Sequence, residues 1–219
     1  MNMEIYANSC TGSSGINGDM YYISEDKKVI ILTDGASGAG KDGKVLMEKV
    51  CVDIAKQFDY LSSNLDAKDY VQYLLLKINS RLIEISQEYN KLVFGTVDIV
   101  VLDNNILTVT TIGDSPVYYY DGEEVKRVAK HPRKYEWMIG QGYITKEQYD
   151  RYINQMHPMM FSCFDIFIPT IVPNNVIEQI TLKENDIVVM CCDGLSDWIN
   201  ENEIFELLSK EGIKIGLIS

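Results

Sequence analysis

Three aspartates stand at the ends of apolar runs in this sequence, each next to a glycine. Asp34 and Asp193 both follow a run of apolar residues and precede a glycine, and Asp114 directly follows the glycine that ends a third run. Asp-Gly is also a common turn dipeptide, so either Asp-Gly pair taken alone equally indicates a turn. A turn, however, does not explain why all three carboxylates follow apolar runs.

Carboxylates brought to the edge of a core need a positive partner, because an unpaired buried charge is costly. Few lysines or arginines lie near these three aspartates in the sequence. Mg²⁺ and Mn²⁺ prefer oxygen ligands, and one carboxylate can bridge two such ions about 3.5–4 Å apart. The pattern therefore predicts a site for divalent cations at the strand ends.

The aspartates belong to a longer ordered set of short motifs. The set is Asn17-x-Asp19, Asp34-Gly35-x-x-Gly38, Gly95-Thr96, Gly113-Asp114-Ser115 and Asp193-Gly194-Leu195-x-Asp197. In order and spacing it resembles the protein phosphatase 2C family of metal-dependent serine/threonine phosphatases, bacterial type, over residues 17–208. The resemblance implies that water activated by metal ions hydrolyses phosphoserine and phosphothreonine in proteins.

The resemblance also implies a role for each matching residue. Asp34 would bridge two Mn²⁺ or Mg²⁺ ions, the Gly35 carbonyl would bind one of them and Asp193 the other. Asp114 would share a third ion with Asp193, and Asp19 would act through water. Asp34 and Asp193 would thus hold the water that attacks phosphorus. The supporting residues expected in the same motifs are Asn17, Asp197 and Ser115.

The sequence departs from the family pattern at three places. The Asp-Asn-x-Thr motif, which carries a further metal ligand near the family's C-terminus, is absent before Ser219. Ser14 stands where bacterial members tend to carry an arginine that binds the substrate phosphate, and Gly18 replaces a glutamate or glutamine. Either the sequence is truncated, or one metal lacks a ligand and the chain is a pseudophosphatase that binds a phosphoprotein without turnover.

A P-loop nucleotidase is the second alternative. Residues 35–41, Gly-Ala-Ser-Gly-Ala-Gly-Lys, follow an apolar run and precede a helical pattern, as a P-loop does. The match is one residue short, and Asp42 stands where a serine or threonine would meet Mg²⁺. The antiparallel hairpins predicted downstream also disagree with a parallel nucleotide-binding sheet.

The elements that must position these residues predict an α+β fold. Apolar stripes at three- and four-residue spacing predict helices over residues 44–60 and 66–90, the second capped by Asp66. Strands are expected at residues 3–8, 20–24, 29–32, 96–102, 106–112, 117–120, 125–128, 166–172 and 187–192, and a last helix at 202–209. We expect residues 1–219 to form one domain, a four-layer αββα sandwich of two mainly antiparallel sheets flanked by helices, as the family has. Part of the family's flap is expected at 142–147.

The composition of the chain indicates which binding partners and which cellular compartment to expect. The formal net charge of −12 disfavours binding to a nucleic-acid backbone. Five cysteines leave at least one unpaired within the chain, which favours a reducing compartment, and no signal peptide or membrane span is recognisable. We therefore expect a cytoplasmic monomer that acts on a phosphoprotein, opposite a cognate serine/threonine kinase.

Overall fold

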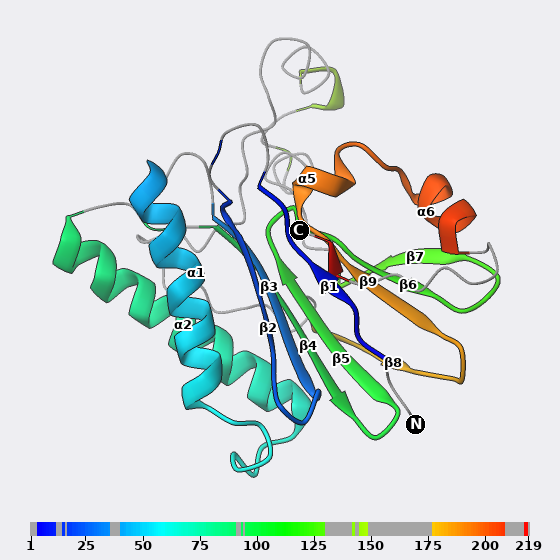
Figure 1. Cartoon of the computed structure of the whole chain (residues 1–219), viewed down its shortest axis with the longest axis horizontal. Helices are drawn as coiled ribbons and strands as arrows, with labels where there is room; N and C mark the ends of the chain where they lie inside the picture. Colours follow the sequence, from blue (N-terminus) through cyan, green and yellow to red (C-terminus); the bar gives the residue numbers. More distant parts are fainter. Residues whose placement is uncertain are drawn as a thin grey trace.

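The computed structural model describes residues 4–11, 15, 17–35, 40–90, 93, 95–129, 142, 145–148, 177–208 and 217–218. Figure 1 labels the elements in chain order. They are β1 (Ala7–Asn8), β2 (Asp19–Ile23), β3 (Val29–Gly35), α1 (Gly40–Gln57), α2 (Ala67–Tyr89), β4 (Gly95–Asp103), β5 (Ile106–Ile112), β6 (Val117–Tyr120), β7 (Val125–Val128), β8 (Ile177–Thr181), β9 (Ile187–Met190), α5 (Asp193–Ser196), α6 (Glu201–Leu208) and β10 (Leu217–Ile218).

The strands form two antiparallel sheets, as predicted. One has five strands in the order β2-β3-β4-β5-β8, and the other has three in the order β7-β6-β9. The short strands β1 and β10 pair with each other in parallel. Because β3 lies between the antiparallel neighbours β2 and β4, the loop that follows it does not leave a parallel sheet as a P-loop would.

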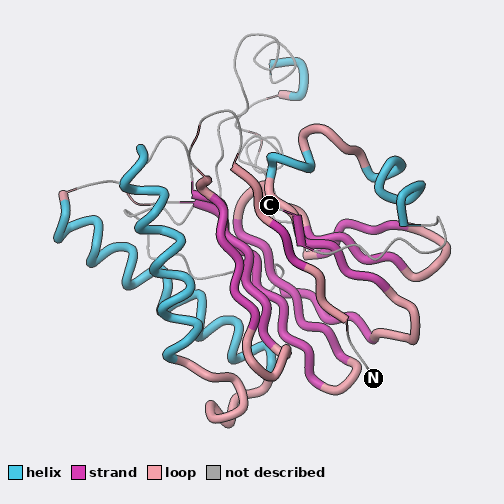
Figure 2. Tube along the Cα trace, viewed as in Figure 1, coloured by secondary structure: helices cyan, strands magenta, loops and turns pink. Residues whose placement is uncertain are grey.

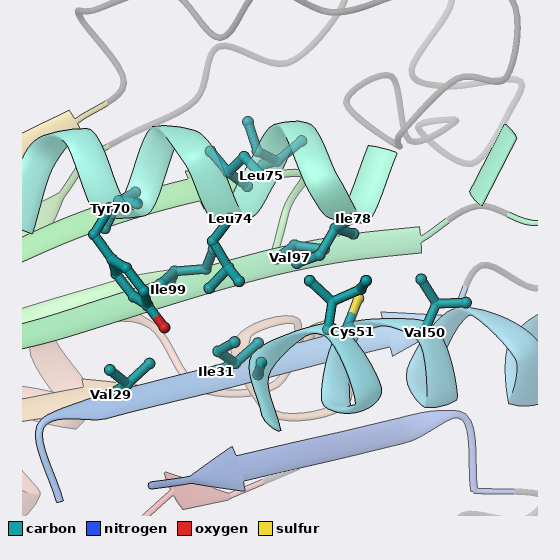
Figure 3. Packing of buried hydrophobic residues seen from close by; sticks show 14 of the residues in the cluster. Val29, Ile31, Val50, Cys51, Tyr70, Leu74, Leu75, Ile78, Val97 and Ile99 are labelled. Carbon is teal, nitrogen blue, oxygen red and sulfur yellow. The ribbon is translucent and has the colours of Figure 1, made fainter. Parts of the chain in front are cut away.

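Helices α1 and α2 cover one face of the five-stranded sheet (Figure 2). The apolar stripe of α2 is buried against alternate residues of β3 and β4, such as Ile31 and Ile99 (Figure 3). Asp66 caps α2 as predicted, since its side chain accepts a hydrogen bond of 2.9 Å from the Asp69 amide. This layer fixes the position of β3, the strand that ends in the first aspartate of the site.

Two further apolar clusters define the remaining layers. Leu32 and Val100 of the large sheet pack against Val117 and Met190 of the small sheet. On the other face of the small sheet, Tyr118 and Val189 pack with α6 through Ile204 and Leu208. The order helix, sheet, sheet, helix confirms the predicted four-layer sandwich, because each interface between layers has its own buried cluster.

Some boundaries differ from the predictions. Helix α1 begins at Gly40, one turn earlier than expected, and β9 ends at Met190 because the next residues lead into α5. Strand β8 was not predicted: it is a partly exposed edge strand whose central residues are Glu178 and Gln179, and it lacks an apolar run. The strand expected at 166–172 and most of the expected flap lie outside the described residues.

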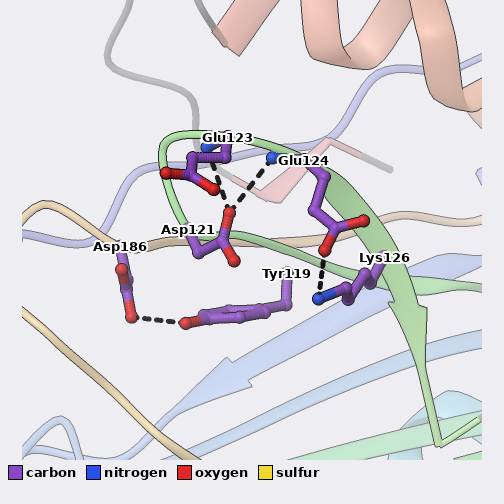
Figure 4. A network of polar contacts seen from close by, with 6 residues as sticks. All are labelled: Tyr119, Asp121, Glu123, Glu124, Lys126 and Asp186. Carbon is purple, nitrogen blue, oxygen red and sulfur yellow. Dashed lines mark hydrogen bonds and ion pairs between the residues drawn. The ribbon is translucent and has the colours of Figure 1, made fainter.

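Polar contacts fix the hairpin of β6 and β7 at the far end of the small sheet (Figure 4). Asp121 accepts hydrogen bonds of 3.0 Å from the amides of Glu123 and Glu124, which lowers the pKa of its carboxyl group. The Tyr119 hydroxyl donates a 2.6 Å hydrogen bond to Asp186 in the turn before β9. These contacts hold β6 beside β9, the strand that leads to Asp193.

No helix within the described residues has the length and apolarity needed to cross a bilayer.

Candidate metal centre

The pairing of β2 with β3 places two aspartates side by side. Asp19, the first residue of β2, is in register with Asp34 near the end of β3. Asp34 is 6% exposed, and alternation along β3 directs it to the same face as Leu32, between the two sheets. The Gly35 amide donates a 2.8 Å hydrogen bond to the Gly18 carbonyl, which closes this end of the strand pair.

A third carboxylate joins this pair from the other sheet. Burial, together with the negative charges of Asp19 and Asp193, raises the pKa of Asp34 to about 9. Asp193 is the first residue of α5, directly after the extended residue Cys192. Three carboxylates that lie against one another, one of them buried, suit a hard divalent cation, whose charge would offset their repulsion. The predicted convergence of these aspartates is therefore present in the structure.

Asn17 shapes the turn that leads into β2. Its Oδ1 accepts a 3.0 Å hydrogen bond from the Asp19 amide, and its Nδ2 donates to the Ser9 hydroxyl. The side chain of Asn17 thus links the main chain of Asp19 to Ser9 in the N-terminal segment. This geometry agrees with a supporting role for Asn17.

The backbone of Asp34 is held by two buried hydroxyl groups. Its amide donates a 3.2 Å hydrogen bond to Thr96 on β4, and the Thr96 and Ser115 hydroxyls are 2.8 Å apart. Gly113 makes room for this pair: its φ is +119°, and a Cβ there would lie 2.5 Å from Thr96 Cγ2. Thr96 and Gly113 stand in the sequence motifs but were not among the predicted site residues. Thr96 bonds to the Asp34 amide, and Gly113 leaves the space that Thr96 occupies. Both motifs therefore help to hold the backbone of Asp34.

Two further predicted site residues, Asp197 and Asp114, make contacts of other kinds. Asp197 is exposed at the end of α5, and its amide donates a 2.9 Å hydrogen bond to the Asp193 carbonyl. Asp114 is half-buried after β5, and its charge acts on Asp98 of β4. Asp197 therefore supports the backbone of Asp193, and Asp114 lies near enough to Asp98 for their charges to interact.

Asp98 was missed by sequence reasoning, although an aspartate within the apolar run of residues 97–102 was a visible signal. It is 0% exposed, and neither carboxylate oxygen has a hydrogen-bond partner within the part of the chain that the structure describes. Burial raises its pKa well above the usual range, the charge of Arg127 opposes this shift, and Asp114 adds to it. Arg127 is thus the positive charge that acts on this buried carboxylate.

Cys192 was also missed as a candidate ligand. The donor atoms of Asp19, Asp34 and Cys192 all lie within 4.8 Å of one another, and Cys192 is fully buried. Burial raises the pKa of its thiol well above the usual value, and the two aspartates add to the shift. The signal in the sequence was the position of Cys192 directly before Asp193.

No protein-family model and no curated protein sequence matches the chain. Solved structures do. The serine/threonine phosphatase PstP/Ppp of Mycobacterium tuberculosis has a TM-score of 0.70 at 20% identity, over 89% of this chain and 80% of that one. The catalytic domain of PstP in complex with 2 manganese ions has a TM-score of 0.69 at 19% identity, over 92% and 81%.

Stp1 of Staphylococcus aureus, a serine/threonine phosphatase, has a TM-score of 0.70 at 18% identity. The match covers 97% of this chain and 87% of that chain. Sequence identity is low in each comparison, while the arrangement of the elements is shared over most of both chains. The chain therefore has the fold of these bacterial serine/threonine phosphatases.

Proposed function

We propose that this protein removes phosphate from phosphoserine or phosphothreonine in proteins and uses two divalent cations, Mn²⁺ or Mg²⁺. The observation that carries the proposal is the contact of the Asp34 carboxylate with those of Asp19 and Asp193. The shared fold supports it, since one neighbour with this fold was solved with 2 manganese ions.

Asp34 is the residue suited to contact both ions, because it has a carboxylate neighbour on β2 and another at the start of α5. We assign the Gly35 carbonyl and Asp193 to the two ions, Asp19 to a contact through water, and Asp114 with Asp193 to a third ion. When bound, such ions lower the pKa of a water molecule and neutralise charge on the phosphoryl oxygens. The backbone support from Thr96 holds the Asp34 carboxylate in place for this role.

A cysteine nucleophile does not fit the geometry. The thiol beside the carboxylates is that of Cys192, which is 0% exposed and has a raised pKa. A reactive cysteine is a thiolate in an electropositive, partly exposed environment. The environment of Cys192 is the reverse, so hydrolysis by water remains the chemistry that the site supports.

Hydrolysis of a phosphothreonine peptide and of p-nitrophenyl phosphate by the full chain tests the proposal. We expect Mn²⁺-dependent turnover that chelator abolishes and that Asp34→Asn lowers by at least about 10²-fold, as expected for loss of an electrostatic catalytic group. Mn²⁺ binding measured by calorimetry should weaken in the same variant. Asp53→Asn is the matched control, because Asp53 is an exposed aspartate of α1.

Binding of Mn²⁺ and of the phosphopeptide without turnover would contradict the proposal and identify a pseudophosphatase. Equal turnover by Asp34→Asn and Asp53→Asn would place the chemistry elsewhere. Nucleotide binding that protects the chain from proteolysis would instead favour the P-loop alternative.

The finer assignments are a monomer, a cytoplasmic location and an opposing serine/threonine kinase. The odd number of cysteines favours the reducing cytoplasm, and the fold shared with phosphatases favours an opposing kinase. Light scattering of the purified chain tests the first, and localisation of a tagged chain tests the second. Loss of phosphate from a kinase-treated lysate on addition of the chain tests the third.

A further inference from the structure

Cys192 brings a sulfur atom to a site otherwise made of oxygens. Its Sγ lies within 4.8 Å of a carboxylate oxygen of Asp19 and of Asp34. Met190 and Cys192 both belong to the apolar cluster between the sheets, while Cys191 belongs to the cluster under α6. The thiol of Cys192 therefore faces the layer that contains Asp34, and the thiol of Cys191 faces away from it.

The spacing of these donor atoms suits a single ion. Zinc binds sulfur at about 2.3 Å and carboxylate oxygen at about 2.0–2.2 Å in a tetrahedral arrangement, so two donors on one ion are about 3.3–3.7 Å apart. The three atoms of the group lie within 4.8 Å of one another. Shifts of less than about 1 Å in each side chain would bring all three donor atoms to one tetrahedral ion.

The surroundings of the Asp34 carboxylate are a second, independent indication that a cation binds beside it. It is 6% exposed, and the neighbours that act on it are two further carboxylates. No arginine or lysine among the described residues is paired with it. An ionised carboxylate in such surroundings needs a positive charge beside it, and without one the group takes up a proton.

We infer that Cys192 makes this centre discriminate between metals: as a sulfur ligand it gives thiophilic ions such as Zn²⁺ and Cd²⁺ a tighter site on Asp19 and Asp34 than Mg²⁺ or Mn²⁺ finds there. Mg²⁺ and Mn²⁺ bind through oxygen and gain little from sulfur, whereas Zn²⁺ gains a strong bond. The thiol releases its proton to solvent as the metal–sulfur bond forms. Thiophilic ions then displace the ions of the oxygen site and inhibit turnover.

This inference rests on the metal centre of the proposed function but not on turnover. The probe is Cd²⁺ alone, added to the metal-free full chain with Cys10 and Cys163 replaced by serine. These two are the exposed cysteine and the one outside the described residues. A sulfur-to-cadmium charge-transfer band in the ultraviolet should appear. Cys192→Ser should abolish it, while Cys191→Ser, the matched control on the opposite face, should keep it.

The competing affinities give a second readout. We expect Cys192→Ser to weaken Zn²⁺ binding by at least about tenfold and to change Mn²⁺ binding far less. Loss of a residue that only hydrogen-bonds to a metal ligand already costs about tenfold in metal affinity, and a direct ligand should cost at least as much. Retained Mn²⁺ binding also proves that the variant is folded, and Cys192→Ala is used if the serine variant does not fold. An equal charge-transfer band in Cys192→Ser, or equal losses of Zn²⁺ and Mn²⁺ affinity, would overturn the inference.

The outcomes separate this inference from the proposed function. If the chain hydrolyses phosphopeptide and the band persists in Cys192→Ser, the sulfur ligand is contradicted while the phosphatase activity stands. A band that depends on Cys192 in a chain without turnover supports the sulfur ligand and contradicts the phosphatase activity.

Discussion

The main-chain amide of Asp34 donates a 3.2 Å hydrogen bond to the hydroxyl oxygen of Thr96, which is itself 2.8 Å from the hydroxyl of Ser115. Thr96 and Ser115 are both fully buried. The carboxylate that the site depends on is therefore carried by a backbone whose position β4 and the β5–β6 connection determine.

Replacing Thr96 by valine tests this support. Thr96→Val keeps the shape of the side chain but removes the hydroxyl that accepts from the Asp34 amide and bonds to the buried Ser115 hydroxyl. We therefore expect the free energy of unfolding to fall by about 1–3 kcal/mol and Mn²⁺ to bind more weakly. Thr110→Val is the matched control, because the Thr110 hydroxyl is buried and has no hydrogen-bond partner among the described residues. Denaturant unfolding should find the control as stable as the wild type or more stable. Equal losses in the two variants would contradict the role of Thr96.

Gly113 should tolerate no side chain. Its φ is +119°, and an added Cβ would lie 2.5 Å from Thr96 Cγ2 and 2.7 Å from Thr96 Cβ. We expect Gly113→Ala to lower the melting temperature and the affinity for Mn²⁺ together, because Thr96 must move. Gly122→Ala is the control, since Gly122 has a φ of +92° with nothing within 4 Å of the added atom. Backbone strain alone would make the two variants equivalent in both measurements.

The buried carboxylate of Asp98 should depend on Arg127. Arg127→Met removes the positive charge that opposes the rise in the pKa of Asp98, and we expect the free energy of unfolding to fall by about 1 kcal/mol, because Arg127 is half-buried. Adding Asp98→Asn should recover much of this loss, because no charge then remains buried. A double-mutant cycle in denaturant measures the coupling, and the exposed Lys126→Met is the control. Additive effects of the two substitutions would show that the charges do not interact.

The metal-free protein should lose stability as pH rises from about 4 to about 9. Burial and neighbouring carboxylates raise the pKa of Asp34 from its ordinary value of 3.8 to about 9. The folded state therefore binds a proton more tightly than the unfolded state, so this contribution is full below the unfolded pKa and disappears through the folded one. Thermal unfolding in chelator across this range measures the slope, which Asp34→Asn should flatten. A slope unchanged by Asp34→Asn would assign the effect to other groups.

The sequence by itself determined the elements and the acidic chemistry. The apolar stripe of α2, its Asp66 cap and the hairpin of β4 and β5 depend on local periodicity and turn residues, and each lies close to its predicted place. The aspartates at strand ends were visible for the same reason. Strand β8 was not, because an edge strand with Glu178 and Gln179 at its centre has no apolar signal.

Only the tertiary structure decided which residues meet. The register of β2 on β3 sets Asp19 against Asp34, and the packing of the two sheets brings in Asp193 and Cys192. The same packing turns Asp98 toward the space between the sheets, near the charge of Arg127. These contacts join residues that are far apart in the sequence; Thr33 and Cys192, for example, are 159 positions apart. Local pattern carries no information about such pairs, because strand register and sheet packing depend on burial over the whole chain.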